Sequence, residues 1–313
     1  MNKIWERPNL ISIVILVAVL GIGVAYVAFT VSQRPEMESF TVGDDYFFPY
    51  NFDRLDRVVT LPDKLEEISG LCRGNRPGEV FAIQDEAGEL YVVNTLTGEP
   101  VREHDFDKDR DYEGVARNGD QVYVLEKDGD IHYFTYYEDE DELPAEKLET
   151  DFSYRNDTEG ICYDSLTGNL LIVPKEQELN GNPDDGEARR GIYSFHLDEG
   201  RLNPQPDYFV DMLEVGRIVF GTNREYPIKP SGIAVDPFNG DLFILSSVGN
   251  ILVVIDRESR VKHVELLEKK TFAQPEGITF AENGDLYISS EGRGDHGIIA
   301  TLSRMQQPLT NEQ

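Results

Sequence analysis

The chain has 313 residues, and its 59 acidic against 29 basic side chains give a formal net charge of −30 at pH 7. Nucleic acids and anionic membrane surfaces are bound through a cationic footprint, so this balance argues against both as electrostatic partners and favours the attraction of cations. With 40% apolar residues and aromatic residues spread along the chain, the composition also differs from that of a disordered protein.

The N-terminal segment from 9 to 32 contains no charged residue and is nearly all apolar. A run of about 20 apolar residues is long enough to cross a bilayer as a helix. Lys3 and Arg7 precede this run, and strongly acidic sequence follows it. Because positively charged flanks stay in the cytoplasm, we expect an uncleaved signal anchor, with residues 1–8 in the cytoplasm and the rest outside. A cleaved signal peptide is the alternative.

A linker is expected at 33–50, and the first predicted strand of the folded part lies at 57–61. Short apolar strands separated by Gly or Asn turns then recur every eight to twelve residues. This pattern predicts an all-β fold. The first unit holds four such strands, at 68–72, 79–84, 89–94 and 101–106.

Each of five units opens with the same phrase, a polar residue followed by glycine and an aliphatic residue. The polar residues are Ser69, Glu113, Glu159, Ser231 and Glu276. Successive phrases are 44 to 46 residues apart, except for a spacing of 72 between the third and the fourth. A polar insertion at 176–190 and an irregular stretch at 211–229 explain the long spacing, with a degenerate sixth unit as the alternative. A fixed period of this size is typical of a repeat architecture.

The fifth unit lacks a fourth strand, whereas the strand at 57–61 belongs to no unit. We therefore predict a five-bladed β-propeller over residues 51–305, closed by its own N-terminal strand and followed by a tail at 306–313. Closure of the ring removes the exposed strand edges that an open array would carry.

The first strand of each propeller blade lines the central channel, so the five polar residues should meet at one mouth. Carboxylates held close together repel one another, and a cation would relieve that repulsion. Calcium suits a wide ring of carboxylate, carbonyl and water oxygens better than magnesium does. The alternative is that the polar residue and glycine serve only a repeated bulge or turn. The predicted metal ligands are Glu113, Glu159 and Glu276, with Ser69, Ser231 and Asp111 in support.

The ends of the second strands should face the same mouth. Lys175 lies at one of them and could hold an anionic group, which makes it the candidate catalytic residue of a metal-assisted hydrolase. The sequence contains no G-x-S-x-G elbow and no phosphate-cradling glycine loop. The acidic tract at 138–142 is predicted to be a solvated loop. Cys72 and Cys162 occupy equivalent places in non-neighbouring units, so we expect buried thiols and no disulfide.

These features resemble the SdiA-regulated family of YjiK-like proteins, which includes the CarP group. The resemblance covers residues 55–303. It rests on the order Ser, Glu, Glu, Ser, Glu at the five blade starts and on the segments 159–163, 175–176, 274–278 and 286–291. It implies a five-bladed propeller on a single N-terminal anchor in the inner membrane, facing the periplasm, with a link to calcium. A phytase-like or esterase-like activity is implied on fold grounds alone, and a fold does not establish a function.

The sequence therefore predicts a membrane-anchored, periplasmic propeller that binds a calcium-like divalent ion at its channel mouth. It would act as a binding or regulatory module for a small molecule or a protein at that mouth. Two alternatives stay open. One is a metal-dependent hydrolase of phosphate or carboxylic esters, and the other is an acidic scaffold that binds proteins through its outer face.

Overall fold

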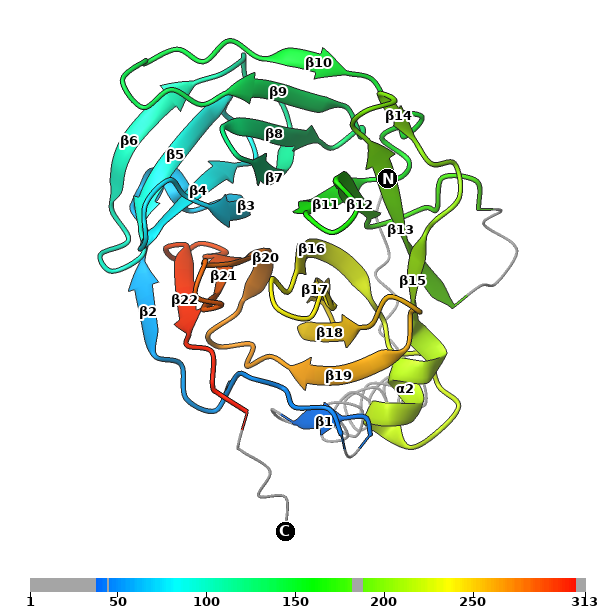
Figure 1. Ribbon diagram of the computed structural model, residues 1–313. Helices are drawn as coiled ribbons and strands as arrows, with labels where there is room; N and C mark the ends of the chain where they lie inside the picture. The colour runs from blue at the N-terminus through cyan, green and yellow to red at the C-terminus, as the bar shows by residue number, and fades with distance from the viewer. Residues whose placement is uncertain (1–37, 44, 182–187, 308–313) are drawn as a thin grey trace, which may run out of the picture. The chain divides into compact units, whose positions relative to one another are not determined.

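The computed structural model describes residues 38–43, 45–181 and 188–307. These residues form five antiparallel sheets arranged as the blades of a propeller, which confirms the predicted all-β architecture (Figure 1). No helix among the described residues is long and apolar enough to span a membrane, and the predicted anchor at 9–32 lies outside them.

Each blade runs outward from an inner strand near the axis to an outer strand at the rim. Blade 1 consists of β3 (Ile68–Arg73), β4 (Glu79–Gln84), β5 (Glu89–Asn94) and β6 (Pro100–Asp105). Blade 2 consists of β7 (Tyr112–Asn118), β8 (Gln121–Glu126), β9 (Ile131–Thr135) and β10 (Glu146–Leu148). Blade 3 consists of β11 (Thr158–Asp164), β12 (Asn169–Pro174), β13 (Arg189–His196), β14 (Arg201–Leu202) and β15 (Tyr208–Asp211).

The last two blades each take a strand from the start of the propeller. Blade 4 consists of β16 (Lys229–Val235), β17 (Leu242–Val248), β18 (Ile251–Ile255), β19 (Val261–Leu266) and β1 (Ser39–Thr41). Blade 5 consists of β20 (Gln274–Phe280), β21 (Leu286–Glu291), β22 (Ile298–Leu302) and β2 (Arg57–Thr60). The pairing of β2 with β22 is the predicted closure of the ring, with Val59 opposite Ile299.

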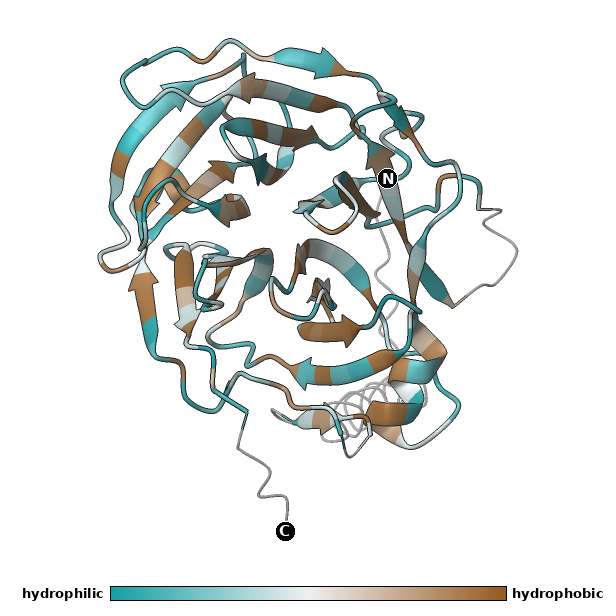
Figure 2. Ribbon diagram, viewed as in Figure 1, coloured by the Kyte–Doolittle hydropathy of each residue, from teal (hydrophilic) through white to brown (hydrophobic). Residues whose placement is uncertain are grey.

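The hydrophobic core lies between neighbouring blades. Alternate residues of a strand point to opposite faces of its sheet. Ile161 accordingly packs with Tyr123 and Leu125 of blade 2, whereas Cys162, the next residue, packs towards Ile233 of blade 4. The middle strands are covered on both faces and are strongly apolar, while the outermost strands β6 and β10 are polar (Figure 2).

Two predicted irregular regions contain regular structure. The stretch at 211–229 holds the helix α2 (Met212–Phe220), which begins at the capping carboxylate of Asp211 and ends at Gly221. A capping carboxylate and a left-handed glycine are common helix boundaries, but the sequence pattern indicated no helix here. The predicted linker contributes β1, and Phe48 stacks on His263 of β19 with 3.6 Å between the ring centroids. Cys72 and Cys162 are free thiols; Cys72 is buried, as predicted, whereas Cys162 is only half-buried.

Candidate cation site

The five inner strands meet around one axis because their glycines allow close approach (Figure 1). A Cβ atom on Gly70 would lie 2.8 Å from the Cα of Gly114, and one on Gly160 would lie 3.0 Å from the Cα of Gly232. None of the five phrase glycines has a positive φ, so backbone conformation does not require them. Their role is to admit the neighbouring backbone at a crowded axis.

The polar residue of each phrase sits at an irregularity in the pairing of the inner strand. The register shifts at this point in all five blades, between residues 68 and 71, 112 and 114, 158 and 160, 230 and 232, and 275 and 278. A bulge leaves one residue unpaired and re-aims its side chain. The repeated bulge, which the sequence analysis gave as the alternative to a polar ring, is therefore present. The same positions also bring polar residues together, so the two explanations do not exclude each other.

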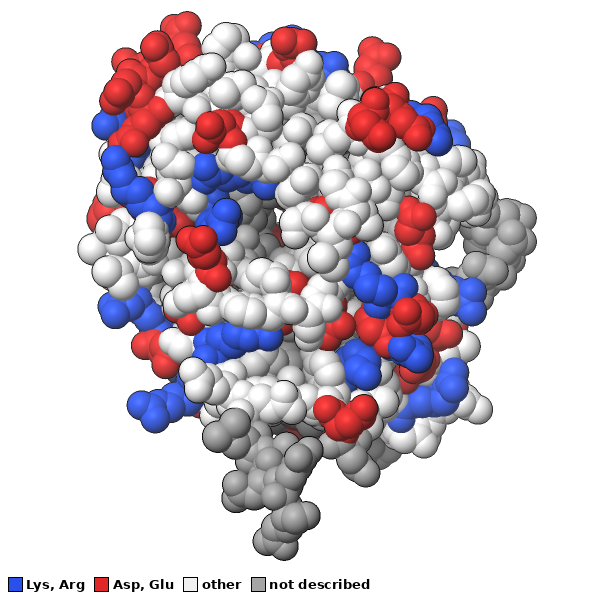
Figure 3. All heavy atoms as spheres, viewed as in Figure 1, with Lys and Arg blue, Asp and Glu red and all other residues white. Residues whose placement is uncertain are grey.

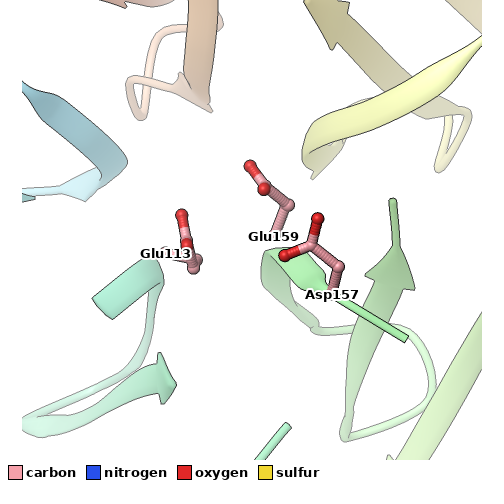
Figure 4. Close-up of side chains that lie close together, drawn as sticks. All are labelled: Glu113, Asp157 and Glu159. Carbon is pink, nitrogen blue, oxygen red and sulfur yellow. The ribbon is translucent and has the colours of Figure 1, made fainter. Parts of the chain in front are cut away.

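Three carboxylates come together where blades 2 and 3 meet. One oxygen each from Glu113, Asp157 and Glu159 lies within 4.8 Å of the other two (Figure 4). Glu113 belongs to β7 and Glu159 to β11, whereas Asp157 precedes β11 in a left-handed conformation with φ of 54°. The sequence analysis missed Asp157. Asp157 lies outside the strand in a left-handed conformation, so the alternation of side chains along an extended strand does not predict its position.

Two lysines reach this carboxylate cluster from equivalent hairpin corners. Lys127 directly follows β8, and its Nζ lies 3.5 Å from Oε1 of Glu113 and 3.3 Å from Oδ1 of Asp157. Lys175 directly follows β12, and its Nζ donates a hydrogen bond of 2.6 Å to Oε1 of Glu159. The ends of the second strands of blades 2 and 3 thus face the mouth, as the sequence indicated.

Glu276, the third predicted ligand, is not one of the three clustered carboxylates. It is 4% exposed, and its Oε2 atom has no hydrogen-bond partner in the described part of the chain. Burial, followed by the negative charges of Glu159 and Glu291, raises the pKa of Glu276 well above its usual value. A buried carboxylate oxygen without a partner is costly, and each such group in a folded protein requires an explanation.

Electrostatics link these acids with others around the mouth. Burial and then the charge of Glu159 raise the pKa of Glu113 to about 8, although Lys127 and Lys175 oppose this. Burial and then the charge of Asp85 raise the pKa of Glu291, at the end of β21, to about 7. Burial and then the charge of Glu67 raise the pKa of Asp85 to about 6. The negative charge at the mouth is therefore only partly balanced by its two lysines.

The supporting residues from the sequence analysis lie in different settings. Ser69 and Ser231 are buried, and their hydroxyl groups donate to the backbone carbonyls of Glu67 at 3.3 Å and Pro275 at 2.7 Å. Asp111 is exposed and is not one of the three clustered carboxylates, although its charge acts on Asp85.

Several solved structures are similar to this chain, all at low sequence identity. Glutaminyl cyclase from Myxococcus xanthus is 16% identical with a TM-score of 0.51, and the match covers 81% of this chain and 97% of that one. A luciferin-regenerating enzyme is 11% identical with a TM-score of 0.48, and the match covers 85% of this chain and 95% of that one. The PQQ-bound aldose sugar dehydrogenase from Streptomyces coelicolor is 14% identical with a TM-score of 0.48, and the match covers 80% of this chain and 97% of that one. At these identities the likeness concerns the fold alone.

The sequence comparisons bear on the family. No curated protein matches the chain. The model of the SdiA-regulated family matches residues 226–293, a stretch that contains the opening phrases of blades 4 and 5. This match confirms, over those residues, the resemblance of the chain to the SdiA-regulated family.

Proposed function

We propose that the protein binds a calcium-like divalent cation at the carboxylate cluster of the channel mouth and works as a cation-dependent binding or regulatory module. The observation that carries this proposal is the set of three carboxylate oxygens within 4.8 Å of one another. Calcium binds oxygens at about 2.3–2.6 Å, so two oxygens on opposite sides of one ion are about 4.6–5.2 Å apart. The spacing of the cluster therefore suits a single ion.

The electrostatic setting also supports a cation. Glu113, Glu159 and Glu276 are largely buried, and burial is the first cause of the raised pKa of each. A bound cation would stabilise the charged carboxylates in the way that solvent does for exposed ones. Calcium accepts irregular sets of oxygens, whereas magnesium requires a near-octahedral arrangement. Backbone carbonyls and water at the mouth would complete the coordination.

The geometry favours a binding function over the hydrolysis of esters. A hydrolase at this mouth would use a free ammonium at Lys175 to hold an anionic substrate. The Nζ atom of Lys175 is instead 2.6 Å from Oε1 of Glu159 and forms an ion pair with it. We therefore propose that Lys175 supports the carboxylate cluster by pairing with Glu159.

We also propose that the predicted anchor at 9–32 holds the propeller in the periplasm.

Calorimetry with the full-length chain in detergent tests the proposed function. The wild type should take up calcium, and Glu159→Gln should weaken the binding at least tenfold because it removes one of three clustered charges. Glu265→Gln is the matched control, since Glu265 is also buried but pairs with His263 in β19, away from the inner strands. An absence of calcium uptake by the wild type, or equal losses in the two variants, contradicts the proposal.

A further inference from the structure

Lys127 lies among the oxygens that the proposed cation would need. Its Nζ is 3.5 Å from Glu113 and 3.3 Å from Asp157, and both carboxylates belong to the group of three within 4.8 Å. Charge-assisted hydrogen bonds between nitrogen and oxygen are about 2.7–2.9 Å long. The ammonium is thus attracted by two carboxylates without a short hydrogen bond to either.

Lys175 makes a different contact on the other side of the cluster. It forms one short hydrogen bond of 2.6 Å to Glu159, and its side chain is 24% exposed against 35% for Lys127. Lys175 therefore fixes the orientation of one ligand. Lys127 bridges two ligands loosely from a more exposed position, and its long stem can carry the ammonium into solvent.

We propose that Lys127 is an internal competitor for the divalent cation. This inference rests on the proposed function and concerns the regulation of the same site. A calcium ion bonded to Glu113 and Asp157 would lie close to the present position of the ammonium, and two positive charges repel at that range. Binding of the ion therefore requires Lys127 to leave the cluster.

The replacement of the Lys127 ammonium by calcium sets the range of calcium concentration over which the site fills. Before an ion arrives, the ammonium offsets part of the repulsion between Glu113 and Asp157. The ion then has to displace a charge that the carboxylates already hold, so its apparent affinity is lower than the three oxygens alone would give. The chain would respond to rises in calcium and would not hold the ion permanently.

The variant Lys127→Met in the full-length chain tests this exchange. We expect calcium to bind at least tenfold more tightly by calorimetry, because the competing charge is gone. We also expect a lower melting temperature than wild type in a chelator, because Glu113 and Asp157 lose their partner. With saturating calcium the difference should shrink or reverse. Lys127→Arg, which keeps the charge, should not tighten binding.

Lys147→Met is the matched control. Lys147 also bridges two carboxylates, at 3.3 Å from Glu126 and 2.6 Å from Asp130, and its side chain is 33% exposed. Its loss should lower the melting temperature equally with and without calcium and leave calcium affinity unchanged. If Lys127→Met fails to fold, Lys127→Gln serves in its place.

The outcomes separate the two proposals. If wild type binds calcium but Lys127→Met binds it no more tightly, the competitor role is overturned and the proposed function stands. If neither protein binds calcium, both proposals fail. If Lys147→Met tightens binding as much as Lys127→Met, the effect is one of net charge, and the specific role of Lys127 is overturned.

Discussion

At the scale of single residues, the mouth places more acid than base in a poorly solvated setting. Asp85, Glu113 and Glu291 have raised pKa values of about 6, 8 and 7, each with burial as the first cause. The sequence led us to expect this crowding at three glutamates. Asp85 directly follows β4 and Glu291 ends β21, so both lie at ends of second strands, which the sequence also placed at the mouth.

The raised pKa of Glu291 predicts a loss of stability with rising pH. A carboxyl whose pKa is higher in the folded state binds its proton more tightly there. The contribution of Glu291 to the free energy of unfolding therefore falls as pH rises from 4.5, the usual pKa of a glutamate, to about 7, its pKa in the folded protein. Above that pH the contribution is constant. Glu291→Gln removes the penalty, so the variant should be more stable than wild type at pH 8 by about 1 kcal/mol, allowing for solvent screening.

Urea unfolding in the presence of a chelator measures this effect. The gain of Glu291→Gln over wild type should be larger at pH 8 than at pH 5. Glu282→Gln, which neutralises an exposed carboxylate in the turn before β21, is the control. Its stability relative to wild type should be the same at pH 5 and pH 8. A gain for Glu291→Gln that does not change between pH 5 and pH 8 would show that the charge of Glu291 is not the cause.

At the scale of the elements, the inner strands combine two devices. A bulge re-aims the polar side chain, and the following glycine lets the next strand approach. The same local sequence is used in five blades, but the bulged residue ends in a different environment in each. One oxygen of Glu276 has no hydrogen-bond partner among the described residues, whereas the Ser231 hydroxyl donates to the carbonyl of Pro275 in the neighbouring strand.

Gly232→Ala should be markedly destabilising. The added Cβ would overlap the carbonyl oxygen of Glu276, and this is backbone that cannot rotate away. Overpacking of this kind costs about 1–3 kcal/mol, and we expect the upper part of that range in chemical denaturation. The displacement of Glu276 should also weaken calcium binding.

Gly168→Ala provides the comparison for this substitution. Gly168 has a φ of +76° in an open turn, and no atom of the described segments lies within 4 Å of its added Cβ. Its replacement should cost about 1 kcal/mol through backbone strain alone and leave calcium binding unchanged. Equal costs in the two variants would refute close packing as the role of Gly232.

At the scale of the whole molecule, the ring is closed by the strand β2, which comes from the other end of the chain. On the face shown in Figure 3, acidic side chains gather at the rim near β6 and the loop leading to β10, and the centre is hollowed. That loop is held to β6, since the amide of Asp105 donates to the carbonyl of Asp141 at 2.9 Å. The acidic tract expected to be a solvated loop thus also joins blades 1 and 2.

The closing strand offers a test of closure with an internal control. Val59 is 8% exposed and packs in the core between blades 5 and 1, whereas its neighbour Val58 is 44% exposed. Val59→Asp buries an unpaired charge and should lower the free energy of unfolding by about 3 kcal/mol or more. Val58→Asp should change it by about 0.5 kcal/mol or less. Similar losses in the two variants, measured by denaturant unfolding, would mean that β2 does not close the ring.

The sequence by itself determined the blades, their number and the closing strand, because apolar alternation, turn residues and the opening phrase are local patterns that repeat. The sequence also placed Glu113 and Glu159 at one mouth, but the tertiary structure decided which other charges join them. Asp157 enters the cluster through a left-handed turn, Asp111 stays exposed, and Lys127 reaches two carboxylates from a hairpin corner. These outcomes depend on how neighbouring blades pack and on where each bulge falls, and a one-dimensional periodicity carries neither.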